Sequence, residues 1–139
     1  MKYEFFEHTA DAKFRAYGKY LEEAFGNAVT AVASVFCDIE KLHKETEMQV
    51  SVKAKKLETL LYDFLEEILF YVDTEQLLCY KAKKIEIQKE DDAYSLNAEL
   101  IADKLVGKEI HGDVKAITYN EMQIKKTDDD WYVQVVVDT

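Results

Sequence analysis

The chain has 139 residues, of which 48% are hydrophobic and 33% are charged, and its formal net charge at pH 7 is −10. This composition is typical of one folded domain and excludes a disordered chain, and no apolar run reaches the roughly 18 residues that a transmembrane helix needs. The acid excess disfavours binding to DNA, or to RNA over the whole surface, because such binding draws on Lys and Arg contacts to phosphate.

The chain begins with two short segments that resemble strands, YEFF at residues 3–6 and AKFRAY at residues 12–17. The start MKYEFFEHTA lacks the long apolar stretch and cleavage site of a secretory signal, so we expect a cytoplasmic protein without membrane contact. Asp11 lies between the two segments, where an Asp often stabilises a turn through its own backbone, and His8 and Thr9 could do the same.

Two segments have the apolar spacing of amphipathic helices. In the first, the apolar stripe comprises Leu21, Ala24, Phe25, Ala28, Val29, Val32, Val35 and Phe36. In the second, it comprises Leu57, Leu60, Leu61, Phe64, Leu65, Ile68, Leu69 and Val72. We interpret both stripes as faces that pack on a hydrophobic core.

The remaining segments alternate with the period of two that is typical of strands. They cover residues 48–54, 85–87, 94–100, 114–124 (with a bend) and 131–137. The polar sequence KKTDDDWY reads as a hairpin turn before the last strand, and it lacks the pattern of an EF-hand loop. Neighbouring strands without helices between them favour antiparallel pairing. We therefore predict an α+β fold, with two amphipathic helices packed on a mainly antiparallel β-sheet in a two-layer single domain.

Cysteine and lysine patterns add local expectations. Cys37 and Cys79 form no CxxC pair and follow apolar residues, so we expect buried, reduced thiols. The sequence KAKK occurs at residues 53–56 and 81–84, which predicts solvated strand edges protected by lysine. A small basic patch that faces RNA or an acidic partner is the alternative.

Most enzyme signatures are absent from the sequence. It contains no GxGxxG, no GxxxxGK[ST], no HExxH and no GxSxG motif. His8, His43 and His111 are scattered, and we expect His43 and His111 at the surface. No nucleophile with a base at a recognisable spacing is visible.

Several segments in order nevertheless resemble the archease family over essentially the whole chain. They are HTAD at residues 8–11, LEEAFGNAVTAV, LLYDFLEEILFYVDT, VKAITY, and a last strand that ends in Asp plus one residue. Residues 1–139 would then form a single archease-like domain. The chain departs from the family pattern at Asn120, where a His is common, at Thr139, where a large aliphatic residue is usual, and after Asp11, where a glycine is often seen.

The resemblance implies a divalent metal site formed by Asp11, Asp138 and the terminal carboxylate of Thr139. Both side chains and the α-carboxyl group ionise well below pH 7 when unperturbed, and three such groups close together repel one another. A hard cation relieves this repulsion, and ligands that are all oxygen suit Ca²⁺ or Mg²⁺ better than Zn²⁺. The resemblance favours Ca²⁺, with Mg²⁺ or Mn²⁺ as alternatives.

The resemblance also implies a function. Archeases assist the GTP-dependent RNA ligase that joins tRNA halves after splicing, by promoting its guanylylation and multiple turnover, and they are not themselves enzymes. Lys115 matches a family lysine at the same tip of the molecule, where it would contact phosphate or a ligase carboxylate. RNA would be met through the ligase. Two other functions stay open, a metal-dependent phosphoesterase and a general chaperone or RNA-binding module that uses the KAKK segments.

Overall fold

The structure is a computed structural model that describes residues 1–8 and 11–139. The elements are β1 (Tyr3–Phe6), β2 (Ala12–Gly18), α1 (Leu21–Phe36), η1 (Ile39–Lys41, a 3-10 helix), β3 (Thr46–Ala54), α2 (Leu57–Glu75), β4 (Leu77–Glu90), β5 (Ala93–Lys104), β6 (Ala116–Lys126) and β7 (Trp131–Asp138). Both helices and all the expected strands are present, and the strands at residues 85–87 and 94–100 are parts of the longer β4 and β5. The order of elements along the chain is the predicted one.

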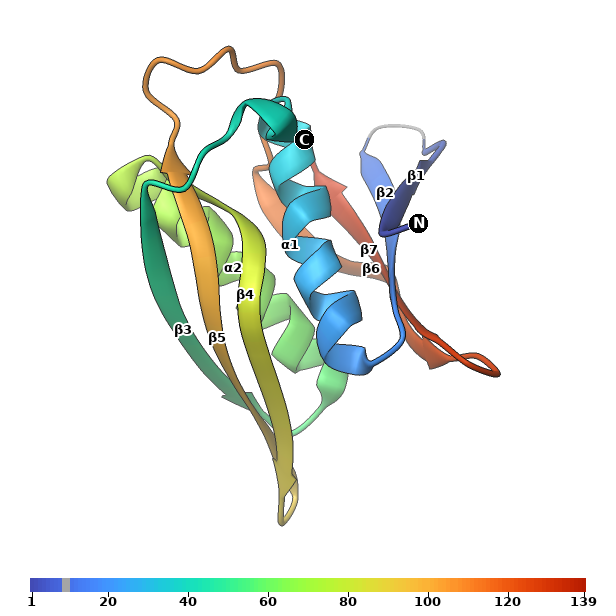
Figure 1. Cartoon of the computed structure of the whole chain (residues 1–139). Helices are drawn as coiled ribbons and strands as arrows, with labels where there is room; N and C mark the ends of the chain where they lie inside the picture. Colours follow the sequence, from blue (N-terminus) through green and yellow to red (C-terminus); the bar gives the residue numbers. More distant parts are fainter. Residues whose placement is uncertain (9–10) are drawn as a thin grey trace.

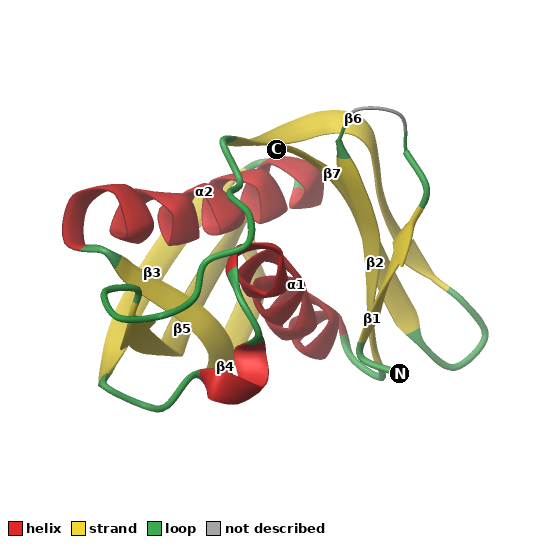
Figure 2. Ribbon diagram, turned by 90° about the horizontal axis from the view of Figure 1, so that it is seen from above, coloured by secondary structure: helices red, strands yellow, loops and turns green. Residues whose placement is uncertain are grey.

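The strands form two antiparallel sheets with the helices between them (Figures 1 and 2). One sheet has the order β1-β2-β7-β6 and the other has the order β3-β5-β4. The α+β class, with two helices packed on antiparallel strands, is confirmed. The strands form two sheets rather than one, so the helices have a sheet on each side. Helix α1 can lie between two sheets because it is buried around most of its circumference, and it contacts both β4 and β2.

The core lies where the helices meet the inner faces of the two sheets. Phe25 of α1 stacks on Phe64 of α2 with ring centroids 6.2 Å apart, and both rings are fully buried. Burial of a side chain of this size contributes about 1.5–3 kcal/mol to stability. In the part of the chain that the structure describes, neither helix has the length and apolarity needed to cross a bilayer.

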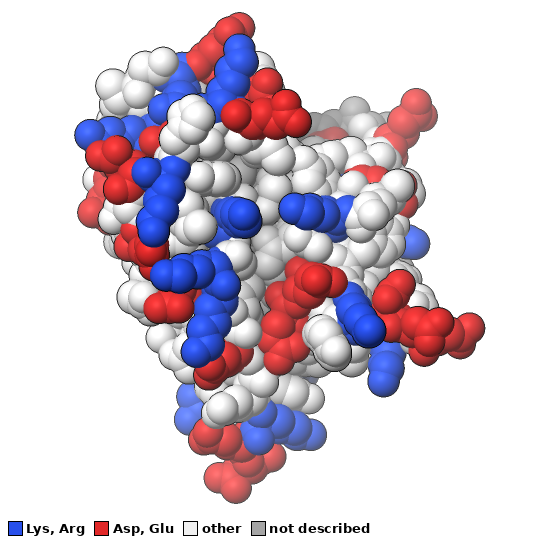
Figure 3. Space-filling view, in the orientation of Figure 1, with Lys and Arg blue, Asp and Glu red and all other residues white. Residues whose placement is uncertain are grey.

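Both KAKK segments lie at sheet edges, as predicted. The copy at residues 53–56 spans the end of β3 and the copy at residues 81–84 lies within β4, and these are the two outer strands of their sheet. Register shifts at Cys79/Lys81 and Ala82/Lys84 distort the edge of β4. Figure 3 shows basic side chains over the sheet of β3, β5 and β4, interspersed with acidic ones. Charge and bulges together oppose pairing of the edge with another chain.

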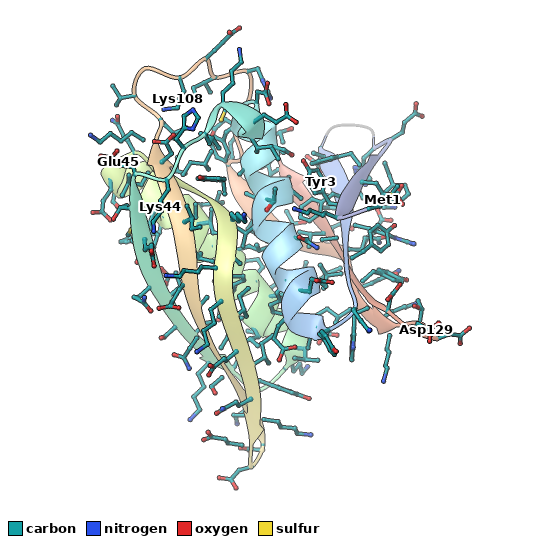
Figure 4. The ribbon with its side chains drawn as sticks, viewed as in Figure 1. Met1, Tyr3, Lys44, Glu45, Lys108 and Asp129 are labelled. Atoms are coloured by element: carbon teal, nitrogen blue, oxygen red, sulfur yellow. The ribbon has the colours of Figure 1, made fainter. Side chains whose placement is uncertain are left out.

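The smaller expectations are also met. Cys37 and Cys79 are free and buried, and His43 and His111 are exposed. The backbone amide of Thr127 donates to the carbonyl of Asp130 at 2.7 Å, which closes the predicted turn between β6 and β7. Figure 4 shows Asp129 at the tip of this turn.

Candidate functional site

The register of three adjacent strands brings the predicted site residues to one end of the molecule. Ala12 of β2 pairs with Val137 of β7, and Ala116 of β6 pairs with Asp138. Asp11 directly precedes Ala12 and Asp138 directly follows Val137, so the antiparallel direction brings both acids to this end of the two strands. Figure 1 shows the chain terminus and the start of β2 at the same end of the molecule.

Alternation along the strands decides which way these side chains face. Ala12 and Val137 face the helices, so Asp11 and Asp138 belong to the outer face of the sheet. Residues directly opposite one another in an antiparallel pair share a face, which brings the two carboxylates to the same side. Asp138 and Thr139 are exposed, and the side chain of Asp11 is 29% exposed.

The backbone of Lys115 lies at this end of the molecule. Its amide donates to the carbonyl of Asp138 at 2.7 Å. Its exposed side chain lines a groove beside α2, which also contains Glu66 and Glu67. The main chain of Lys115 is therefore beside the acidic pair, while its ammonium group lies toward the helix side of the sheet.

The chemistry of the donor set fits a hard divalent cation. Asp11, Asp138 and the terminal carboxylate of Thr139 offer only oxygen, and their exposure leaves room for water ligands. Among residues 1–8 and 11–139, no three His, Cys, Asp or Glu side chains form a metal-binding group. The predicted set contains only two such side chains, because its third donor belongs to the main chain. Thr9 of the HTAD segment lies outside the described residues.

A second polar cluster adjoins Asp11, and sequence reasoning did not find it. Glu121 of β6 accepts hydrogen bonds from His8 Nε2 at 3.0 Å and from Lys13 Nζ at 3.1 Å. These contacts, first that of His8 and then that of Lys13, hold the pKa of the Glu121 carboxyl below its usual value. His8 Nδ1 lies 4.0 Å from Asp11 Oδ2, and it is buried without a hydrogen-bond partner within the described residues. A separation of 113 residues hides the contact between His8 and Glu121 from any local pattern.

A large bulge in β6 delivers Glu121 to this cluster. Thr118 pairs with Val136, and the next pair is Gln123 with Gln134. The four residues from 119 to 122 therefore lie opposite one residue of β7, where a regular ladder would have one residue on each strand. The bend predicted within residues 114–124 is this bulge.

Gln134 of β7 holds the bulge in place through a hydrogen bond. It is only 2% exposed, its Nε2 donates to the carbonyl of Glu121 at 2.7 Å, and its Oε1 accepts from Arg15 Nε at 2.9 Å. Val136 is fully buried although its side chain belongs to the outer face. The outer face of the sheet is therefore covered near the candidate site.

Comparison with known proteins agrees with this architecture. A model of the Archease protein family matches residues 3–139. Protein archease of Methanosarcina mazei is 40% identical over 139 residues, which cover 99% of this chain and 95% of the relative. The solution structure of Methanobacterium thermoautotrophicum protein 1598 superposes with a TM-score of 0.85 at 36% identity and covers 99% of both chains.

A more distant crystal structure shares the fold alone. It is described as an archease and possible chaperone from Thermotoga maritima, with a TM-score of 0.61 at 19% identity, and it covers 96% of this chain and 94% of its own. The protein is an α+β domain in which two helices lie between antiparallel sheets, and acidic residues lie at the adjoining ends of β2 and β7. The chain belongs to the archease family.

Proposed function

We propose that this protein is a cytoplasmic accessory protein that activates the GTP-dependent tRNA-splicing RNA ligase by promoting its guanylylation and multiple turnover. Membership of the archease family supports the accessory role. The observation that carries the proposal is the strand register, in which Ala12 pairs with Val137 and leaves Asp11, Asp138 and Thr139 at the adjoining strand ends.

In this proposal Asp11, Asp138 and the terminal carboxylate of Thr139 hold one divalent cation, with Ca²⁺ favoured over Mg²⁺ or Mn²⁺. A bound cation would relieve the repulsion among the carboxylates and offer positive charge to phosphate oxygens. The exposure of Asp138 and Thr139 leaves this tip accessible to a partner protein. The net charge of −10 would keep the RNA backbone away from the chain as a whole, so RNA is met through the ligase.

Lys115 has a separate role in the proposal. Its backbone is tied to Asp138, whereas its ammonium group is directed to the groove beside α2. Because a lysine contacts phosphate or carboxylate as a point charge, it would engage the nucleotide or an acidic residue of the ligase next to the tip.

The test is single-turnover guanylylation of the cognate ligase with and without this protein. We expect Asp138→Ala, or removal of Thr139, to lower the stimulated rate at least about tenfold, because the first change removes a cation ligand and the second shifts the terminal carboxylate back to Asp138. Asp129→Ala is the matched control, since it removes the same charge from the turn after β6 (Figure 4). An unchanged rate with Asp138→Ala would show that the tip is not the active element.

Two further assays separate the other functions. Turnover of phosphodiester substrates by the purified protein with Ca²⁺, Mg²⁺ or Mn²⁺, without ligase, would favour a phosphoesterase. Tight, salt-sensitive binding of tRNA by the isolated protein would favour an RNA-binding module that uses the KAKK segments at residues 53–56 and 81–84. The activator proposal expects neither result.

A further inference from the structure

Glu121 makes contacts that span the sheet. Its strand, β6, is separated from β2 by β7, yet its carboxylate bonds to Lys13 of β2 and to His8, which lies between β1 and β2. A regular β6 could not make both contacts, because neighbouring strands lie about 4.8 Å apart and side chains stand perpendicular to the sheet. The bulge at residues 119–122 interrupts the ladder, and the hydrogen bond from Gln134 Nε2 of β7 to the carbonyl of Glu121 holds the bulged chain against β7, which makes the reach possible.

The backbone at Glu121 adopts a conformation that L-residues rarely use. Its φ is 54°, in the left-handed region where Glu is uncommon and Asn or Gly is better tolerated. Its carbonyl is held by the buried amide of Gln134. This position would suit Asn or Gly better than Glu. The carboxylate explains why a glutamate is present, because it accepts the hydrogen bonds from His8 and Lys13.

The two partners of Glu121 flank the candidate cation ligand. His8 precedes Asp11 by three residues and Lys13 follows it by two. The hydrogen bonds of Glu121 hold His8 and Lys13, and both side chains lie close to Asp11 along the chain. His8 also packs against Asp11, with Nδ1 4.0 Å from Oδ2.

Glu121 also controls a competing charge. Residues two apart on a strand share a face, so Lys13 and Asp11 both lie on the outer face of the sheet. An unpaired lysine there would be attracted to Asp11 and would oppose the binding of a cation. The 3.1 Å ion pair with Glu121 instead directs the ammonium group of Lys13 toward β6.

We propose that Glu121 is the positioning residue of the candidate cation site. By holding His8 and Lys13, Glu121 positions Asp11 and keeps the ammonium group of Lys13 away from the Asp11 carboxylate. This inference rests on the proposed function, because it assumes that Asp11 and Asp138 bind a cation. Glu121 itself is not a ligand in this proposal, and it acts through His8 and Lys13.

The test is calorimetric titration of Ca²⁺ into the full chain and its variants. Glu121→Asn removes the carboxylate and suits the left-handed backbone, so we expect unchanged or higher thermal stability with about tenfold weaker Ca²⁺ binding. Asn120→Ala, in the same bulge, is the matched control and should bind Ca²⁺ within about twofold of the parent. The double variant Glu121→Asn with Lys13→Gln should recover part of the lost affinity, because the competing ammonium group is gone.

The outcomes separate this inference from the proposed function. Equal Ca²⁺ affinity of Glu121→Asn and Asn120→Ala, with binding abolished by Asp138→Ala, would overturn the positioning role and leave the cation site standing. A loss of affinity that Lys13→Gln does not relieve would overturn the part of the proposal that concerns Lys13. Absence of Ca²⁺ binding by the parent protein would overturn both the cation site and this inference.

Discussion

The backbone amide of Lys115 donates a 2.7 Å hydrogen bond to the carbonyl oxygen of Asp138. This bond extends the pairing of β6 and β7 beyond Ala116, the first residue of β6. The position of Lys115 is therefore fixed by main-chain contacts, while its side chain is free to act in the groove beside α2. The roles of the Lys115 backbone and of its side chain can accordingly be tested separately.

Under the proposed function, replacing Lys115 by Ala should lower the ligase guanylylation rate about tenfold and leave Ca²⁺ affinity within about twofold of the parent, because the amide that bonds to Asp138 is retained. Single-turnover assays and calorimetry measure the two effects. Lys125→Ala, an exposed lysine on the same strand, provides the control. An equal loss of rate in both variants would assign the effect to general charge.

Replacing Gln134 by Leu should lower the free energy of unfolding by about 1–3 kcal/mol. The change leaves the carbonyl of Glu121 and the Nε of Arg15 without their buried partner. Urea denaturation followed by circular dichroism gives the value, and Gln88→Leu on the exposed part of β4 should change stability by less than about 0.5 kcal/mol. Similar values for the two variants would mean that the bulge does not depend on Gln134.

Asp103 should make stability depend on acidic pH. Burial raises the pKa of its carboxyl, but hydrogen bonds from the His43 amide, from Lys108 Nζ and from the Lys104 amide together outweigh burial, and the pKa is lowered. A lowered folded-state pKa gives stability that is present above the unfolded value of about 3.9 and is lost as pH falls through the folded value.

Asp103→Asn removes this titration, so its stability should fall less steeply than that of the parent below about pH 4. Urea denaturation from pH 2.5 to pH 7 tests the difference. Asp129→Asn at the β6–β7 turn, where the side chain is exposed, should keep the parent's slope. Parallel curves for the parent and Asp103→Asn would contradict the prediction.

Cys79 should be almost unreactive in the folded protein. Burial raises the pKa of its thiol to about 12, and the side chain is fully buried. At pH 7.5 the thiolate fraction would be on the order of 10⁻⁴ to 10⁻⁵, and the thiolate is the reactive form. Labelling with a thiol reagent in native buffer and in denaturant, with Cys37→Ser to isolate Cys79, measures the protection. Equal rates in the two conditions would show that this part of the core opens readily.

Much of the fold could be predicted from local patterns. The apolar stripe beginning at Leu21, the stripe beginning at Leu57 and the alternation over residues 131–137 each reflect one element that must bury one face, so the sequence alone determined the helices, the strands and their α+β class. The candidate ligands Asp11 and Asp138 came from a family resemblance, since no local pattern marks them as a pair.

The division of the strands into two sheets, the register that leaves Asp11 and Asp138 at adjoining strand ends, and the contact of Glu121 with His8 were decided by the tertiary structure. Periodicity reports which face of an element is apolar, but not which distant element covers that face. Pairing across the sheet and the bulge in β6 depend on contacts between residues far apart in the chain. Such contacts exist only once the core has placed β2, β7 and β6 side by side.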